Sequence, residues 1–350
     1  MKPIKLLLFS GAALAGAGAV CVGGAAYLAI QGVARLKSRT LRGKVVLITG
    51  SSRGLGLALA EAFAERGAKL VLTARDPEAL ERARRHLMGR GVGEAEILVV
   101  PADLRRLKDA EQLIEQATLH YGQVDVLVNN AGVITVGPME NQSVSEFRDT
   151  MDANFFSAVH CVSSVLPQMV ARRAGTIVNI GSMGGKVAVP HMLPYTASKF
   201  ALVGFSEGLH AELRGRGVHV LTVCPGLMRT GSHVNAQFTG KAQEEYRWFS
   251  LAANTPGLST RAACAARRIV RAVQLEETEI AITPAAMVAA RLSAVAPEVT
   301  LRVLRTANRF LPGAAAETAR AQRGAEVRQR EVAPAAAIGG AAARRYNQTG

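Results

Sequence analysis

Three side chains near the middle of the sequence have the types and the spacing for acid–base chemistry on an oxygen atom. Tyr195 and Lys199 are four residues apart, which on a helix places them one turn apart on the same face. A phenol with a pKa of about 10 is a poor acid or base at neutral pH unless a nearby cation lowers that pKa. Lys199 would be this cation, and Ser182 would donate a hydrogen bond to the substrate oxygen. A surface tyrosine beside a solvated lysine explains the pair alone equally well.

A glycine-rich segment indicates where a phosphorylated cofactor would bind. Residues 49–56, with the sequence TGSSRGLG, join the first predicted strand to the first predicted helix. Glycines permit a tight turn and a close approach of a pyrophosphate to the backbone, while the helix N-terminus offers free N–H groups. Because the GxxxGxG spacing differs from the GxGxxG of many dinucleotide-binding folds, the position between strand and helix carries this interpretation. We expect cofactor contacts from Gly50, Ser52, Leu55 and Gly56.

Two arginines predict which dinucleotide is preferred. Arg75 ends the second predicted strand, 19 residues after Gly56. An acidic residue there would bind the adenosine ribose hydroxyls, whereas an arginine would bind a 2′-phosphate. Arg53 in the glycine-rich segment can reach the same phosphate, so the sequence favours NADP(H) over NAD(H). Asp76 is the one feature against this preference, and Arg75 could instead be a solvated strand end.

The elements that must position these residues alternate between strands and helices. Short runs rich in β-branched residues predict seven strands, and the segments between them have helical patterns, the first two at residues 56–67 and 77–90. Such alternation is typical of a parallel sheet with helices on both faces. We therefore expect residues 44–284 to form one α/β, doubly wound (Rossmann-type) domain with a mostly parallel, seven-stranded sheet. Its strands are predicted at residues 44–50, 69–75, 97–103, 124–132, 176–182, 218–226 and 279–284.

Several further motifs follow the glycine-rich segment in a fixed order. They are Asp103 at a strand end, Asn129-Asn130-Ala131-Gly132, Asn154, Ser182, Tyr195 with Lys199, and Pro225-Gly226 with Thr230. With these motifs, and with Tyr195 13 positions after Ser182, the sequence resembles the short-chain dehydrogenase/reductase family over roughly residues 44–284. The resemblance implies an oxidoreductase whose catalytic set is Asn154, Ser182, Tyr195 and Lys199.

The resemblance also implies a role for each residue that matches a motif. Asn154 would hold a water that relays protons to Lys199, which would also bind the nicotinamide ribose. Asp103 would bind the adenine amino group, and Asn130 would line the cofactor near its ribose. Asn129 is instead expected to stabilise the sheet, and Thr230 would hold the carboxamide. The remaining implied cofactor contacts are Leu104, Tyr195, Pro225 and Gly226.

The segment before this domain predicts a membrane anchor. Residues 6–34 carry no charge and include an apolar run of 25 residues, which at about 1.5 Å per residue would cross the roughly 30 Å hydrocarbon layer as a transmembrane helix. A secretory signal peptide is the main alternative, although its apolar part is usually shorter. The basic linker, residues 35–43, is more positive than the basic N-terminus, residues 1–5, so a single-pass protein would keep its catalytic domain on the cytosolic side.

The segments after the domain are predicted to be less compact. Residues 285–312 have the pattern of an amphipathic helical extension, broken at Pro297. It could lie on a membrane surface, over the substrate cleft or against another subunit. Residues 313–350 contain almost no large apolar side chain, so we expect a flexible low-complexity tail.

Charge and cysteine content exclude other classes of function. The chain has 42 basic and 27 acidic residues, but residues 45–300 hold 26 and 24 of them, so the positive excess lies at the two ends. A nucleic-acid-binding domain would carry that excess on its folded body, and no nucleic-acid partner is expected. Four cysteines without a CxxC pair indicate neither a disulfide framework nor a thiolate metal site, and no metal is expected.

The last predicted feature is the substrate lid that the resemblance places at residues 231–258. Its aromatic side chains, Phe238, Tyr246, Trp248 and Phe249, either line an apolar pocket or simply pack the lid. Together with the anchor, they favour an NADP(H)-dependent oxidoreductase that interconverts a carbonyl and a secondary alcohol on a small lipophilic substrate, steroid-, retinoid- or fatty-acyl-like. The alternatives are a 3-oxoacyl reductase acting on carrier-bound chains and a non-catalytic, NADPH-sensing membrane scaffold. The resemblance further implies a homodimer or homotetramer.

Overall fold

The structure, a computed structural model, describes residues 38–255, 259–316, 320–327 and 333–348. It divides the chain into a short unit, Met1–Thr40, and a large unit, Leu41–Gly350, and the large unit contains all the elements below. The predicted anchor at residues 6–34 lies outside the described residues. Within the described ranges, every helix is too short or too polar to span a membrane.

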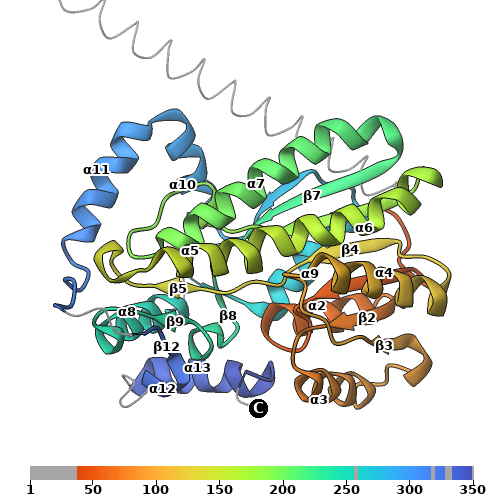
Figure 1. Cartoon of the computed structure of the whole chain (residues 1–350), viewed down its shortest axis with the longest axis horizontal. Helices are drawn as coiled ribbons and strands as arrows, with labels where there is room; N and C mark the ends of the chain where they lie inside the picture. Colours follow the sequence, from red (N-terminus) through yellow and green to blue (C-terminus); the bar gives the residue numbers. More distant parts are fainter. Residues whose placement is uncertain (1–37, 256–258, 317–319, 328–332, 349–350) are drawn as a thin grey trace, which may run out of the picture. The chain divides into compact units, whose positions relative to one another are not determined.

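Seven parallel strands form the central sheet, as the sequence predicts (Figure 1). Their order across the sheet is β11-β7-β6-β4-β1-β2-β3, and each neighbouring pair runs parallel. The order reverses direction between β1 and β4, which in open α/β sheets is where ligands bind, beyond the carboxyl ends of the strands. The strands are β1 Val45–Thr49, β2 Lys69–Thr73, β3 Ile97–Val99, β4 Val126–Asn129, β6 Gly175–Ile180, β7 Val218–Cys224 and β11 Glu279–Ala281.

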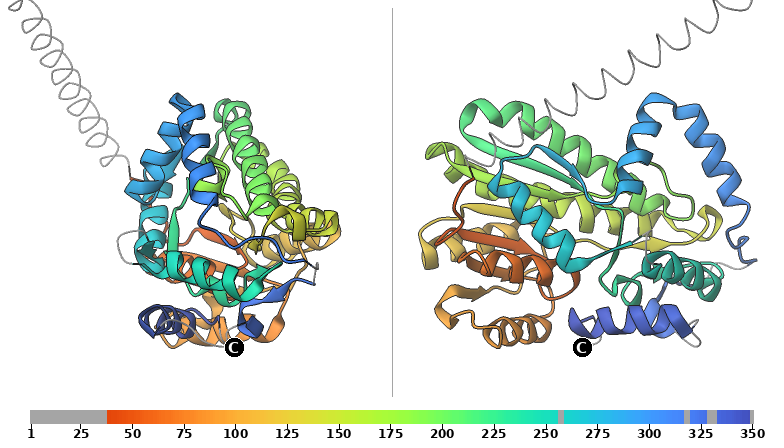
Figure 2. Two further views of the ribbon diagram at one scale, coloured as in Figure 1. Left: turned by 90° about the vertical axis from the view of Figure 1, so that its left-hand side faces the viewer. Right: turned by 180° about the vertical axis from the view of Figure 1, so that it is seen from behind.

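Helices cover both faces of this sheet (Figure 2). Side chains alternate along each strand, so Val46 and Ile48 pack on one face, whereas Val45 and Leu47 pack on the other. The first face is covered by α2 Gly54–Ala64, α3 Pro77–Met88 and α9 Ala262–Gln274, and the second by α4 Leu107–Tyr121, α6 Ser157–Ala171 and α7 Leu193–Leu213. Both faces are therefore buried, which explains why the strands are almost continuously apolar.

Smaller elements lie beyond the carboxyl edge of the sheet. A three-stranded sheet joins β5 to β9 in parallel and β9 to β12 antiparallel, and a separate pair joins β8 to β10. These elements are β5 Thr135–Val136, β8 Leu227–Arg229, β9 Gln237–Phe238, β10 Ser259–Arg261, β12 Gln322–Arg323, α5 Val144–Met151 and α8 Ala242–Asn254.

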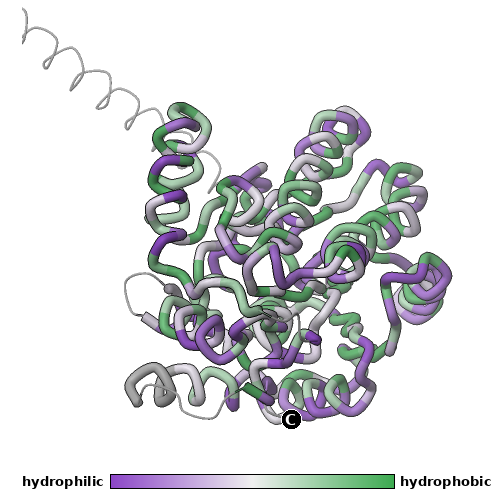
Figure 3. Tube along the Cα trace, turned by 60° about the vertical axis from the view of Figure 1, so that its left-hand side comes forward, coloured by the Kyte–Doolittle hydropathy of each residue, from purple (hydrophilic) through white to green (hydrophobic). Residues whose placement is uncertain are grey.

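The C-terminal part contains four helices, α10 Pro284–Val295, α11 Pro297–Asn308, α12 Gly324–Val327 and α13 Ala333–Arg345. Hydrophobic and hydrophilic residues are interleaved along α10 and α11 (Figure 3). The described parts of residues 313–350 differ from the predicted flexible tail, because β12, α12 and α13 contact the main domain. A few side chains are enough to hold them: Val327, Ala343 and Tyr346 are all buried.

Candidate active site

The predicted acid–base residues come together at the carboxyl edge of the sheet. Ser182 follows β6, and Tyr195 and Lys199 lie in the first two turns of α7. A hydrogen bond joins the Ser182 and Tyr195 hydroxyl groups, and the Lys199 ammonium nitrogen lies 5.8 Å from the centroid of the Tyr195 ring. The Lys199 Nζ atom donates a 2.8 Å hydrogen bond to the carbonyl oxygen of Ile180, which fixes the side chain.

Burial changes the acidity of both side chains. Desolvation lowers the pKa of Lys199 to about 8. It raises the pKa of Tyr195, although the hydrogen bond from Ser182 acts in the opposite direction. In this structure Tyr195 therefore holds its proton at neutral pH, as a proton donor must. Desolvation of the phenol is the largest influence on the pKa of Tyr195 in the protein alone, and the lowering influence comes from Ser182. The expected effect of Lys199 on this pKa stays a prediction.

Asn154 lies next to this group on the turn between α5 and α6. The turn, Asp152–Phe156, is a π-helix, a wide turn that often occurs at functional sites. The Asn154 amide donates to the Ser198 hydroxyl at 2.9 Å, and its oxygen accepts a 2.6 Å hydrogen bond from the Val133 amide. A Cβ atom on Gly132 would lie 2.8 Å from Asn154 Oδ1 and 3.8 Å from Lys199 Nζ. Asn154 and Lys199 therefore approach the same short backbone segment.

The glycine-rich segment has the bare backbone that a pyrophosphate requires. Gly50 and Gly54 have φ of +63° and +60°, a region that favours glycine. A Cβ atom at Gly56 would lie 2.2 Å from the Gly50 carbonyl oxygen. Asn130 holds the turn from the neighbouring strand end, because its amide donates to the carbonyl oxygens of Thr49 at 2.9 Å and Gly50 at 3.3 Å. The residues present therefore fit a dinucleotide.

The neighbouring Asn129 has the structural role that we expected. Its side-chain amide lies buried between β4 and β6, where it donates to Asn179 Oδ1 at 2.9 Å.

The two predicted phosphate-binding arginines lie near each other. Burial lowers the pKa of Arg53, and the charges of Arg75, Arg82 and Arg323 act in the same direction, whereas Asp76 opposes them. Arg53 Nη1 donates to Asn235 Oδ1 at 3.1 Å. Asp76 is the one sequence feature against a 2′-phosphate, and its carboxylate caps α3 by accepting a 3.0 Å hydrogen bond from the Ala79 amide.

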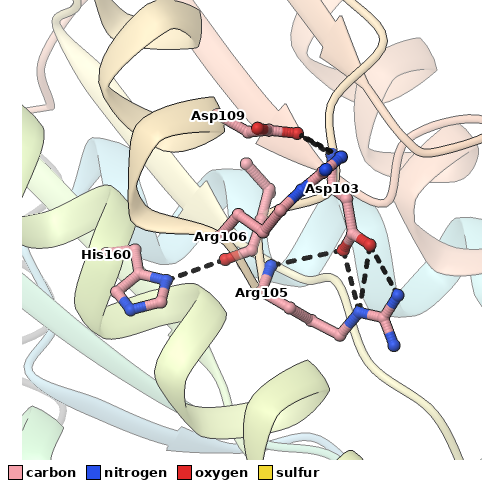
Figure 4. Close-up of polar contacts among 6 residues, drawn as sticks. Asp103, Arg105, Arg106, Asp109 and His160 are labelled. Carbon is pink, nitrogen blue, oxygen red and sulfur yellow. Dashed lines mark hydrogen bonds and ion pairs between the residues drawn. The ribbon is translucent and has the colours of Figure 1, made fainter.

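Asp103 lines a hollow of about 310 Å³ whose other lining residues are Arg75, Pro101, Ala102, Arg106 and Asp109. Its carboxylate pairs with Arg105, whose Nε atom donates to both oxygens at 2.9 and 3.1 Å (Figure 4). These bonds lower the pKa of Asp103. The next residue, Leu104, is fixed through its backbone, because its carbonyl oxygen lies 3.0 Å from His160 Nδ1. Arg105 could not be predicted from the sequence, because a basic residue two positions after an acid carries no specific signal.

The loop after β7 supplies the remaining predicted contacts. The Pro225 carbonyl oxygen accepts a 2.8 Å hydrogen bond from the Met183 amide, which joins this loop to the segment after Ser182. A Cβ atom on Gly226 would lie 2.2 Å from Thr283 Oγ1, so a larger residue there would force the Thr283 side chain to move. Thr230 is buried, and its hydroxyl accepts a 3.2 Å hydrogen bond from the Ser232 amide.

The aromatic residues of the lid segment, residues 231–258, mostly pack against one another. Phe238, Tyr246 and Phe249 are buried, and the ring of Phe238 lies 5.4 Å from that of Tyr246 and 5.9 Å from that of Phe249. Trp248 is only partly buried and belongs to the same apolar cluster as Tyr195. Of the two interpretations, packing of the lid therefore applies to three of the four rings.

A buried carboxylate that the sequence did not indicate joins the lid to the catalytic helix. Glu245 on α8 is completely buried. One of its oxygens is 2.7 Å from His191 Nδ1, and the other accepts a 2.6 Å hydrogen bond from Trp248 Nε1. His191 has a φ of +62° and lies four residues before Tyr195. Glu245 thus connects α8 to the segment that leads into α7.

Comparisons with known proteins agree with this site. The family model for short chain dehydrogenases matches residues 44–239. A dehydrogenase/reductase SDR family protein 7-like from Anopheles gambiae is 35% identical over 271 residues, which cover 77% of this chain and 84% of that protein. The ketoacyl reductase HetN from a Nostoc strain is 34% identical over 244 residues, 69% of this chain and 79% of that one.

A solved structure has a similar fold. A short-chain dehydrogenase/reductase from Burkholderia phymatum, in complex with NAD, superimposes with a TM-score of 0.66 at 29% sequence identity, covering 75% of this chain and 96% of that chain. Six of the seven strands of the central sheet, the glycine-rich segment and the group of Ser182, Tyr195 and Lys199 lie within residues 44–239, which the family model matches. The chain therefore belongs to the short-chain dehydrogenase/reductase family of oxidoreductases.

Proposed function

We propose that this protein is an NADP(H)-dependent oxidoreductase that interconverts a carbonyl and a secondary alcohol on a small lipophilic substrate. The observation that carries the proposal is the group formed by Ser182, Tyr195 and Lys199, in which a protonated phenol is joined to a serine hydroxyl beside a buried lysine. A bound nicotinamide ring would supply or accept the hydride, and the side chains handle the proton and the oxygen.

Each side chain has a distinct task in this proposal. The Tyr195 hydroxyl donates its proton to the substrate oxygen during reduction and accepts one during oxidation. Ser182 holds that oxygen, because its own hydroxyl oxygen is fixed by a 3.0 Å hydrogen bond from the Gly184 amide. Lys199 stabilises the tyrosinate that remains, and Asn154 keeps the backbone near Val133 in place beside Lys199.

The preference for NADP(H) rests on charge at the adenosine end. Arg53 and Arg75 are close enough for their charges to interact, and the Asp76 carboxylate that follows Arg75 is already used as a helix cap. Arginine matches the geometry of a phosphate, and a second guanidinium group adds to that recognition. The Burkholderia structure contains NAD, so the proposed preference for NADP(H) rests on Arg53 and Arg75 of this chain and not on the fold.

The lipophilic substrate is supported by the surroundings of Tyr195. Its ring belongs to an apolar cluster with Ile134, Val189, Met192 and Trp248, and such surroundings suit a substrate with little polar surface. The similarity to a ketoacyl reductase keeps the 3-oxoacyl alternative open. A screen that compares free lipophilic ketones with 3-oxoacyl chains on a carrier protein decides between them by kcat/KM.

Residues 6–34 would bring such a substrate to the enzyme from a membrane. This part of the proposal rests on their sequence, an apolar run of 25 residues flanked by basic segments. Fractionation of cells that express the full chain tests whether the protein is anchored in the membrane. Protease protection then reports on which side of the membrane the catalytic domain lies. Recovery of the protein in the wash fraction at high pH would contradict the anchor.

The cofactor is tested by titration of the purified protein with NADPH and NADH, followed by Trp248 fluorescence. We expect NADPH to bind more tightly, and Arg75→Gln to weaken NADPH binding about tenfold or more, the value of a charged hydrogen bond. Binding of NADH should change less than about twofold, because NADH lacks the 2′-phosphate.

Arg85→Gln is the matched control for that titration. Arg85 is an exposed residue on α3, and its replacement removes the same charge from outside the site. A preference for NADH in the unmodified protein, or equal losses from both variants, would contradict the assignment of Arg75.

A further inference from the structure

The end of the chain lies across the glycine-rich segment, almost 300 residues away in sequence. We call residues 343–348 the C-terminal strap. The Gly54 amide donates a 2.9 Å hydrogen bond to the Tyr346 carbonyl oxygen, and the Asn347 side-chain amide donates to the Ser52 carbonyl oxygen at 2.8 Å. Figures 1 and 2 show the C-terminal end next to α3 in each view.

The strap is held by side chains from several parts of the main domain. Tyr346 is 4% exposed and packs in the same apolar cluster as residues of α2 and α9. Asn347 also donates to the Ala79 carbonyl oxygen at 3.1 Å and accepts from Arg82 Nε at 3.2 Å, both on α3. Asn235 donates to Gln348 Oε1 at 2.6 Å and to the Gln348 carbonyl oxygen at 3.1 Å. The strap therefore bridges the glycine-rich segment, α3 and the lid segment.

These contacts use the groups that a dinucleotide would need. Gly54 begins α2, and the free N–H groups of a helix N-terminus are the donors that bind a phosphate. The Tyr346 carbonyl oxygen already accepts the Gly54 N–H, and its partial negative charge would repel an anion. The Gln348 amide lies so close that a Cβ atom on Gly54 would be 2.7 Å from its Nε2. Backbone and side chain of the strap thus cover the surface that a pyrophosphate must reach.

The adenosine ribose would meet the strap as well. In the proposed assignment, Arg53 in the glycine-rich segment and Arg75 after β2 would both hold the 2′-phosphate of the ribose. Asn347 spans the interval between the glycine-rich segment and α3, since it contacts Ser52 on one side and Ala79 and Arg82 on the other. In addition, Arg53 donates to Asn235, which is itself hydrogen-bonded to Gln348.

The hollow lined by Arg75 and Asp103 has no strap residue in its lining, so the adenine end of the site stays accessible.

We propose that the C-terminal strap is an autoinhibitory element that competes with the dinucleotide for the glycine-rich segment. The cofactor binds when the strap has left, so the apparent Kd equals the intrinsic Kd divided by the fraction of molecules with the strap released. The proposal rests on the proposed function only in that a nicotinamide dinucleotide is the ligand of this segment. A change in the chain end that releases the strap would then activate the enzyme.

The first test compares NADPH affinity in two proteins of the same length and charge. The double variant Asn347→Ala, Gln348→Ala removes the side-chain contacts of the strap but leaves the cofactor site intact. We expect it to bind NADPH about five- to tenfold more tightly than the unmodified chain, the factor that one or two hydrogen bonds contribute. The matched control is Asn308→Ala at the exposed end of α11, which should bind NADPH as the unmodified chain does.

The second test uses the unmodified chain and does not depend on the folding of a variant. Hydrogen exchange of the amides of residues 344–348 is measured with and without saturating NADPH. Displacement of the strap exposes these amides, among them the Gln348 N–H that now donates to the Ala343 carbonyl oxygen at 2.8 Å, so exchange should accelerate. A strap that instead closes over the cofactor would exchange more slowly, and its double variant would bind NADPH more weakly.

The outcomes separate this proposal from the proposed function. Equal NADPH affinity of the double variant and the unmodified chain overturns the strap and leaves the oxidoreductase intact. Slower hydrogen exchange of residues 344–348 on NADPH binding also overturns the autoinhibitory strap, and indicates a strap that closes over the bound cofactor. If neither protein binds NADPH or NADH, releasing the strap does not open a dinucleotide site, and both proposals fail.

Discussion

At the scale of single residues, burial shifts the pKa values of the two acid–base groups of the site in opposite directions. Burial raises the pKa of Tyr195 and lowers that of Lys199 to about 8, so both effects favour the neutral forms. Ser182 opposes the effect on Tyr195 through its hydrogen bond. The protein therefore presents a phenol ready to donate, while its conversion to a base needs additional positive charge at the site.

The removal of the Tyr195 hydroxyl tests its role as the proton donor. Tyr195→Phe should lower kcat by about 10²- to 10⁴-fold, the usual contribution of a positioned acid, and leave the Kd for NADPH nearly unchanged. Tyr121→Phe is the control, because the Tyr121 hydroxyl donates to the Ala95 carbonyl oxygen at 3.1 Å on the exposed side of α4. If Tyr195→Phe kept the biological effect of the protein, the non-catalytic NADPH-sensing alternative would be preferred.

Lys199 links catalysis to stability. Its pKa is about 8 in the folded chain and near 10.5 when unfolded, so the fold binds the proton less well than the unfolded chain does. Below pH 8 Lys199 is charged in both states, and its burial lowers the free energy of unfolding. Between about pH 8 and 10.5 the folded chain has lost this proton while the unfolded chain keeps it, so the free energy of unfolding rises with pH. Lys199→Met should therefore abolish turnover yet raise the free energy of unfolding at pH 7 by about 1 to 3 kcal/mol.

Urea unfolding of both proteins at several pH values measures this difference. The advantage of Lys199→Met should shrink as the pH rises from 8 towards 10, because the unmodified lysine then loses its proton in the fold. An advantage that stays constant with pH would show that the lowered pKa does not destabilise the protein.

At the scale of elements, the carboxyl edge of the sheet gathers the site. Ser182 follows β6, the glycine-rich segment follows β1, and Asn130 follows β4. These positions could be predicted because each depends on a local pattern: a β-branched run, then glycines or a polar residue. The pairing of Asp103 with Arg105 and the connection from Glu245 to His191 could not, since they depend on side-chain directions that the pattern does not contain.

Replacement of Gly56 tests whether the turn between β1 and α2 tolerates a side chain. Gly56→Ala would place a Cβ atom 2.2 Å from the Gly50 carbonyl oxygen, and backbone atoms cannot move aside easily. We expect it to destabilise the fold by about 2 to 4 kcal/mol and to prevent NADPH binding.

Gly208→Ala on α7 is the control, with the opposite expected sign. Its Cβ atom would meet nothing within 4 Å, so alanine should stabilise the helix by about 0.5 to 1 kcal/mol. Thermal unfolding of both variants gives the comparison, and a stable Gly56→Ala that binds NADPH would contradict the tight turn.

At the scale of the whole molecule, the two ends of the domain sequence meet. Asn347 and Ser52 are 295 residues apart and are joined by a hydrogen bond. Composition predicts disorder for residues 313–350 because it counts apolar residues per length, and it cannot tell that one tyrosine reaches a core formed by distant helices. The oligomeric state stays a prediction, as does the membrane anchor.

Replacement of Tyr346 tests whether the end of the chain unfolds cooperatively with the domain. Its ring is buried with residues of α2 and α9, and its hydroxyl hydrogen-bonds the Ala263 backbone in the first turn of α9. If the end unfolds together with the domain, Tyr346→Ala should lower the free energy of unfolding by about 2 to 4 kcal/mol.

Urea unfolding followed by Trp248 fluorescence measures this loss, because Trp248 lies on α8, far from Tyr346 in sequence. The control is Phe310→Ala, which removes a ring that is 84% exposed and should change stability by less than about 0.5 kcal/mol. If the end of the chain frays independently, the two variants should have equal free energies of unfolding.

Equal free energies of unfolding would also mean that the strap is weakly held, so that it could reduce cofactor affinity only slightly. A large loss for Tyr346→Ala alone would instead mean that releasing the strap requires a substantial part of the binding energy of the cofactor.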